Sequence, residues 1–163
     1  MDKSEGMGPS EGNRIVIERA FDAPRDMVFA CWTDPAHLEK WYGPKGFSTV
    51  VDECEARAGG AWRFTLTTPG GKSLPMRGVF EEVDPPRRLV LTDKSAEDMG
   101  MDMGRVLMTI DFDSVDGGTK MTLTIILDDV ERKNMYERSG GVMGWNMAFD
   151  KMAELLKREG DKS

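Results

Sequence analysis

The chain has 163 residues, of which 39% are hydrophobic and 31% are charged, and its formal net charge is −7 at pH 7. A chain of this length and composition is typical of one soluble globular domain, and no apolar run reaches the roughly 20 residues that a membrane-spanning helix needs. The negative charge would repel a phosphate backbone, and no run of Lys and Arg is interleaved with aromatic residues, so we expect neither a nucleic acid nor a membrane as the partner.

The ends of the chain and its two cysteines indicate how it is organised and where it acts. Residues 1–13 are rich in Gly, Ser, Glu and Asp and lack the apolar segment of a secretory signal, so we expect a disordered lead-in there. A single domain should follow over residues 14–159, with a tail over 160–163. Cys31 and Cys54 lack CxxC spacing and fit two buried free thiols, which favours a cytoplasmic protein.

The first third of the domain predicts one strand and two short helices. Residues 14–21 are rich in β-branched side chains and end at an Asp-Ala-Pro turn, as a strand would. Pro24 then suits a first helical turn, and an apolar face recurs at helical spacing, at Met27, Val28, Cys31 and Trp32, until Thr33-Asp34-Pro35 interrupts it. Asp34 and Pro35 suit the cap and first turn of a second helix, which should end before Gly43-Pro44.

From Phe47 onward apolar and polar residues alternate, and Gly-rich or Pro-containing turns separate about six strands. The clearest strands lie at 106–112 and 121–127, and each has one apolar face and one polar face. Gly78 interrupts an earlier apolar pattern and predicts a bulge. Together with residues 14–21, these strands form an antiparallel sheet of about seven strands with one apolar side.

One long helical pattern remains to cover that apolar side. Trp145, Phe149 and Met152 recur at helical spacing, and Lys and Arg follow toward the end of the pattern. The helical region should begin near Glu131 and break at Ser139-Gly140-Gly141, because serine and glycine are poor helix formers. The sequence therefore predicts an α+β fold in which a C-terminal helix closes over a curved sheet and leaves an apolar cavity.

Side chains for catalysis or metal binding are sparse. His37 is the only histidine and lies on a predicted surface helix. Glu53 and Glu55 share a strand face with Arg57, and two interpretations stay open for this group: an exposed stripe at a sheet edge, or inward carboxylates for acid–base work. One histidine and two distant cysteines do not make a zinc site, so we expect no metal and no cofactor.

The methionines carry more information, because thirteen in 163 residues is a high number. Met99, Met101 and Met103 alternate with other residues between two predicted strands, where glycines make the backbone pliable and thioethers make the surface adaptable. This segment is either a lid over a pocket mouth or a mobile loop whose methionines fill gaps in the core.

Four motifs carry a resemblance to a known family: FDAPRDMVFACWTD at 21–34, WYGP at 41–44, EARAGG at 55–60, and Gly144-Trp145. With the order of elements, they resemble the helix-grip fold of the START-like (SRPBCC) superfamily, also called birch-pollen-allergen-like, and its activator of heat-shock-protein ATPase homologue (Aha-type) branch. The resemblance implies a cavity between sheet and C-terminal helix, which members use for lipids, hormones, polyketides or chaperone contact. Two positions depart from the pattern of that branch: Tyr42 stands where a second Trp is common, and Glu55 stands where Asp is usual, and both imply a retuned pocket entrance.

We therefore expect a protein that binds an apolar or amphipathic small molecule, without defined catalysis. The candidate ligand-binding residues are Trp41, Trp62, Phe64, Met76, Met101, Met108, Met143 and Trp145, with Arg57 as a polar group for an acidic or carbonyl-bearing ligand. The alternative for these residues is a role in the core alone. Two other functions stay open: a cyclase or hydrolase that uses Glu53, Glu55 or His37, and a protein-interaction module that acts on a chaperone.

Overall fold

The computed structural model describes residues 12–161. Most of the expected lead-in at 1–13 therefore lies outside the described residues, as do the last two residues of the expected tail. The elements, in chain order, are β1 (Arg14–Phe21), α2 (Arg25–Thr33), α3 (Pro35–Trp41), β2 (Ser48–Cys54), β3 (Ala61–Thr67), β4 (Ser73–Asp84), β5 (Arg88–Asp93), α4 (Ser95–Asp98), β6 (Val106–Val115), β7 (Gly118–Ile126), α5 (Val130–Arg138) and α6 (Gly141–Asp161).

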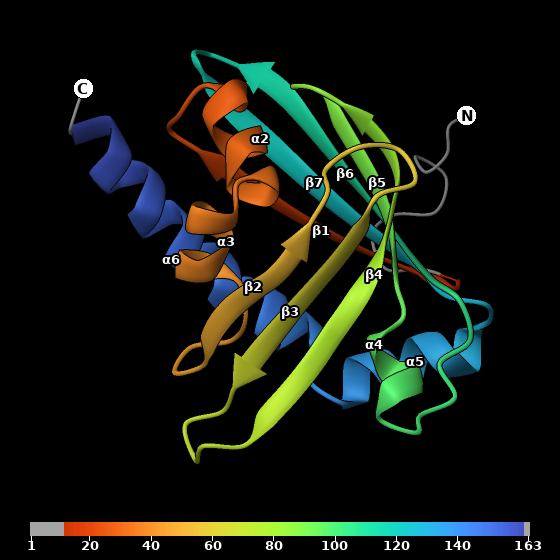
Figure 1. The fold of residues 1–163 in the computed structure, drawn as a ribbon. Coiled ribbons are helices and arrows are strands. Elements are labelled where there is room, and N and C mark those ends of the chain that lie inside the picture. Colours follow the sequence, from red (N-terminus) through yellow and green to blue (C-terminus); the bar gives the residue numbers. More distant parts are fainter. Residues whose placement is uncertain (1–11, 162–163) are drawn as a thin grey trace.

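The seven strands form one antiparallel sheet in the order β1-β7-β6-β5-β4-β3-β2. Strands β2 to β7 are each paired with the next, as a meander requires, and β1 pairs with β7 from Arg14 opposite Ile126 to Phe21 opposite Thr119. Helix α6 crosses one face of this twisted sheet, with α2 and α3 beside it (Figure 1). The predicted helix-grip fold is confirmed.

The second of the two short helices begins as the sequence predicts, and a hydrogen bond joins it to the first. The Asp34 side chain accepts a hydrogen bond from the Ala36 backbone N–H at 3.0 Å, and Pro35 occupies the first position of α3. Trp41 at the end of α3 is fully buried, and its indole N–H donates to the Cys31 carbonyl on α2 at 2.7 Å. That bond fixes the two helices to one another.

The bulge expected at Gly78 is a wrong prediction. Gly78 pairs in regular register with Trp62 on one side and Asp93 on the other, and the shift in register lies between Phe80 and Glu82. A Cβ at residue 78 would lie 1.9 Å from the Thr92 carbonyl oxygen and 2.4 Å from the Trp62 ring. Glycine is therefore required at this position by the close approach of the Trp62 ring, not by an irregular backbone.

The helical region near the C-terminus is broken where the sequence predicts. The Asp129 side chain caps α5 by accepting from the Arg132 backbone N–H at 2.8 Å. Ser139 and Gly140 then separate α5 from α6, and Gly140 has a φ of +89°, which glycine adopts more readily than other residues. Because of this break, α6 begins near α5 and α4 and runs in a new direction (Figure 1).

Candidate functional site

A cavity of about 380 Å³ lies where the break between α5 and α6 meets strands β3 to β6. This volume is typical of sites for small organic molecules. The lining residues are mostly apolar: Tyr42, Gly43, Pro44, Leu66, Met76, Asp93, Ser95, Ala96, Met99, Met101, Met103, Val106, Tyr136, Ser139, Gly140, Gly141, Gly144, Trp145 and Ala148. The cavity can therefore enclose the apolar body of a ligand.

One wall of the cavity is built by residues 94–105, which we call the methionine segment. It contains α4 and the three methionines that follow it. Met103 is buried, whereas Met99 and Met101 are 41% and 42% exposed. All three line the cavity, and Met76 from β4 joins them. Thioether side chains are unbranched and polarizable, so this wall can adapt to ligands of different shape.

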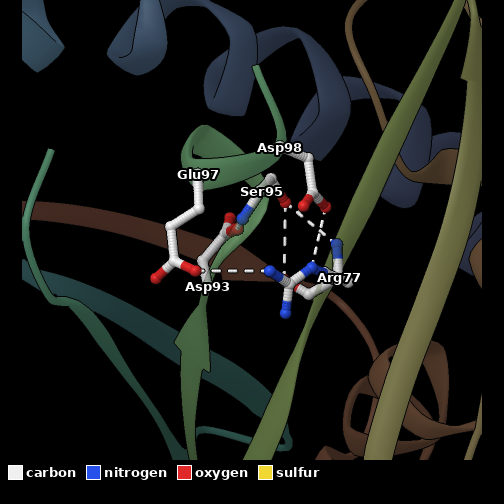
Figure 2. Close-up of polar contacts among 5 residues, drawn as sticks. All are labelled: Arg77, Asp93, Ser95, Glu97 and Asp98. Carbon is white, nitrogen blue, oxygen red and sulfur yellow. Dashed lines mark hydrogen bonds and ion pairs between the residues drawn. The ribbon is translucent and has the colours of Figure 1, made fainter. Parts of the chain in front are cut away.

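The methionine segment is held to the rest of the fold near both of its ends by arginines. On β4, the Arg77 guanidinium lies 2.7 Å from Asp98 and 3.3 Å from Glu97, and its backbone N–H donates to the Ser95 hydroxyl at 3.0 Å (Figure 2). These contacts fix α4 against the sheet.

On α5, Arg132 forms the second attachment. Its guanidinium contacts Asp102 at 2.9 Å and Asp129 at 2.6 Å. Next to it, the backbone N–H of Arg105 donates to Asp128 at 3.0 Å. The Asp102 side chain is 84% exposed, so we expect its ion pair with the half-buried Arg132 to position the segment while adding little to the free energy of unfolding.

The polar groups of the cavity gather at Asp93, the last residue of β5. One oxygen of its carboxylate accepts a hydrogen bond from the Ser95 backbone N–H at 2.8 Å. Desolvation by burial raises the pKa of Asp93, and the hydrogen bonds from Ser95 partly oppose that rise. Among the described residues that line the cavity, Asp93 is the only Asp, Glu, Lys, Arg or His.

Two tyrosines stand near this carboxyl. The Tyr136 hydroxyl accepts a hydrogen bond from the Trp145 indole N–H at 2.8 Å. Burial, and to a lesser extent the charge of Asp93, raise the pKa of Tyr42 and the pKa of Tyr136. Both phenols therefore stay neutral at neutral pH.

A second, smaller cavity of about 20 Å³ lies behind Tyr42 and Trp145, which line both cavities. The two rings meet edge to face, with centroids 5.8 Å apart and planes at 88°. The indole N–H of Trp62 is buried and donates no hydrogen bond to a described residue. Tyr42 and Trp145 thus divide the space under α6 into an outer cavity and a small inner one.

The structure brings some of the predicted binding residues together and separates others. Met76, Met101 and Trp145 line the outer cavity, whereas Trp62, Phe64 and Met108 line the inner one. Trp41, Arg57 and Met143 line neither cavity.

Each of these three residues has a physical reason for lying outside. Trp41 belongs to the packed core behind the inner cavity, where it contacts the rings of Trp32 and Phe149. Arg57 lies in the turn between β2 and β3, is 68% exposed and pairs with Glu55 at 2.8 Å. Met143 is 64% exposed, because it lies on the outer face of α6.

The acid–base candidates also lie outside the cavities. Glu53 on β2 pairs with Arg63, and Glu55 pairs with Arg57 in the turn after β2. Neither pair faces a cavity, so the exposed one of the two interpretations holds for this group. His37 lies 3.7 Å from Asp34 on α3. Within residues 12–161 no three His, Cys, Asp or Glu side chains form a group that could hold a metal ion, and no helix is long and apolar enough to cross a membrane.

Sequence reasoning missed the polar residues of the outer cavity, Asp93, Ser95 and Tyr136. An aspartate at a strand end beside a turn is ordinary, and Tyr136 lies in a helix whose other residues are mostly charged. Tyr42 could be picked out from the sequence, because the family that the chain resembles commonly has Trp at that position.

Comparison with known proteins agrees with the fold. The family described as Activator of Hsp90 ATPase homolog 1-like protein matches residues 22–157. No curated protein matches the sequence.

Solved structures similar to this chain come from several bacteria. A protein from Arthrobacter aurescens is 25% identical with a TM-score of 0.84, over 96% of this chain and 90% of that one. A protein from Mycobacterium smegmatis is 26% identical with a TM-score of 0.80, over 88% and 90%. A protein from Chromobacterium violaceum is 27% identical with a TM-score of 0.76, over 88% and 96%.

Proposed function

The chain belongs to the family of Activator of Hsp90 ATPase homolog 1-like proteins, and from this premise we propose that it binds an apolar or amphipathic small molecule in the outer cavity. The observation that carries the proposal is the cavity of about 380 Å³, with aromatic rings on one side and thioethers on the other. Aromatic and thioether groups give a large contact area to an apolar molecule, and burying that area is the main favourable term in such binding.

Mass spectrometry tests this proposal on the protein as purified. Under native conditions we expect a mass above that of the 163-residue chain, and extraction with organic solvent should release a small apolar compound. An adapted apolar pocket retains its ligand through purification when dissociation is slow.

A cavity-filling substitution gives a sharper test. Gly144 on α6 lines the cavity, and a Cβ at this position meets only Pro44 at 3.5 Å, an ordinary contact. Gly144→Leu should fold, because leucine also favours a helix more than glycine does, and it should abolish binding of 1-octanol in calorimetry. Gly160→Leu, near the exposed end of α6, is the matched control and should bind as the wild type does. Equal binding by wild type and Gly144→Leu would contradict the proposal.

A second function, regulation of a heat-shock-protein ATPase, is favoured by the description of the family and by one feature of the surface. Met99 and Met101 present exposed thioethers at the mouth of the cavity, and methionine surfaces adapt to protein partners. We expect the chain to change the ATPase rate of an Hsp90-type chaperone if this function holds. No change at saturating concentration, with the known activator as positive control, would exclude it.

The cysteines fit a protein of the cytoplasm, which we propose as its location. Cys31 and Cys54 are free. Burial raises the pKa of the Cys31 thiol to about 12 and that of the Cys54 thiol to about 11, so both stay protonated and unreactive at neutral pH.

A further inference from the structure

We propose that the outer cavity selects an organic cation: an amine or quaternary ammonium with an apolar body, whose head group lies against Asp93 between Tyr42, Tyr136 and Trp145. This inference rests on the proposed function and names the class of molecule that the cavity takes. It reverses the polarity expected from Arg57, which would have suited an acidic ligand.

The cavity holds a lone carboxylate. Asp93 is the only charged side chain among the described lining residues, and one of its oxygens accepts from the Ser95 backbone N–H. Arg77 contacts Ser95, yet its guanidinium pairs with Glu97 and Asp98, as Figure 2 shows. The Asp93 side chain is half-buried, and a partly desolvated carboxylate without a cation is costly, so an incoming cation gains more here than it would at a fully exposed carboxylate.

Aromatic rings surround the same space. Tyr42, Tyr136 and Trp145 all line the cavity. The perpendicular contact of Tyr42 with Trp145 and the hydrogen bond of Trp145 to Tyr136 hold the three rings at fixed orientations. The faces of aromatic rings attract cations, and aromatic cages are a common way to bind quaternary ammonium groups.

The described lining of the cavity contains no basic side chain. No Lys, Arg or His of residues 12–161 lines it, so no group there would pair with an anionic head group. The formal net charge of −7 also attracts cations and repels anions at long range. Met76, Met99 and Met101 then supply an apolar surface for the rest of the molecule.

The test uses three probes that share a chain and differ in the head group: n-octylammonium, 1-octanol and octanoate. Calorimetry at pH 7 should show octylammonium binding about tenfold more tightly than 1-octanol, with octanoate the weakest of the three. Asp93→Asn keeps an oxygen for the Ser95 N–H but has no charge, and it should lose the preference for octylammonium over 1-octanol. Asp113→Asn removes one exposed carboxylate on β6 and is the matched control for net charge; it should keep the preference.

The outcomes separate this inference from the proposed function. If 1-octanol binds but octylammonium binds no better, or octanoate binds as well, the cation proposal is overturned and the apolar cavity stands. If the preference survives in Asp93→Asn, Asp93 is not the partner and the proposal is also overturned. If none of the three probes binds, the proposed function itself fails. The wild-type ranking decides even if Asp93→Asn does not fold.

Discussion

The two sides of the outer cavity are built differently. On one side Trp145 lines the cavity, and behind it the rings of Trp32, Trp41 and Phe149 continue into the core, with ring centroids 5.6 Å apart for Trp145 and Phe149 and 4.8 Å apart for Trp32 and Trp41. On the other side the methionine segment at 94–105 contributes one short helix and flexible thioethers, held by exposed ion pairs. We therefore expect the aromatic side to contribute most to stability, and we propose that the methionine segment and Asp93 determine which ligand the cavity accepts.

Substitution within the aromatic side should have the largest effect on stability. Trp41→Ala removes a fully buried ring and its hydrogen bond to Cys31, so we expect the free energy of unfolding to fall by about 3–5 kcal/mol. Urea unfolding measures this change. Met143→Ala, on the outer face of α6, should change it by less than about 0.5 kcal/mol. A comparable loss in both variants would remove the distinction between core and surface that the structure shows.

A substitution at the boundary between the two sides should lower the free energy of unfolding by a smaller amount. Tyr136→Phe leaves the Trp145 indole N–H without its acceptor, and we expect a loss of about 1 kcal/mol in urea unfolding. Tryptophan emission should shift as well, because one ring loses a polar neighbour. Unchanged stability and emission would show that this hydrogen bond does not hold the ring.

The carboxylate of the cavity should cost stability rather than add to it. Because burial raises the folded-state pKa of Asp93 above its ordinary 3.8, the folded protein binds the proton more readily than the unfolded chain. The contribution of Asp93 is then most favourable at low pH and is lost as the pH rises through the raised pKa. Asp93→Asn should therefore be more stable than wild type at pH 7, and the difference should shrink as the pH falls toward 4. A constant difference across that range would contradict this account.

The smallest effect on stability should come from the attachment of the methionine segment. Arg77→Ala removes the contacts to Glu97 and Asp98, which are exposed, so the melting temperature should change little. Amide hydrogen exchange within residues 95–103 should nevertheless become faster, since the segment loses one of its two attachments. Arg87→Ala breaks an exposed pair with Asp84 and is the matched control, with no change expected in that segment. Slow exchange in both variants would show that Arg77 does not hold the segment.

The order of elements could be predicted from the sequence because its signals are local. Alternating apolar residues, Gly-rich turns and the Asp34-Pro35 cap each act over a few residues, and the structure confirms the fold that they indicate. The apolar face of the strands was also predicted with the right residues, including Trp62, Phe64 and Met108.

Which residues of that face line the outer cavity could not be predicted, because the position of the cavity depends on how distant segments pack together. In the sequence, Trp41 and Trp62 stand at apolar positions of predicted elements just as Trp145 does, yet of these three only Trp145 lines the outer cavity. Asp93 shares the cavity with Ser95 and Ala96 of α4 and with Tyr136 of α5, which come later in the chain. Sequence periodicity shows which residues face inward, but the space left between them follows from long-range packing.

The methionines themselves allow the most direct test of the central claim, that the outer cavity binds an apolar molecule. With ¹³C-labelled methionine methyl groups, titration of 1-octanol can be followed by NMR at each assigned methionine. The account predicts shifts at Met76, Met99, Met101 and Met103, which line the cavity, and none at Met143, which is exposed on α6. Unmoved signals from the four lining methionines, or a shift at Met143 alone, would contradict it.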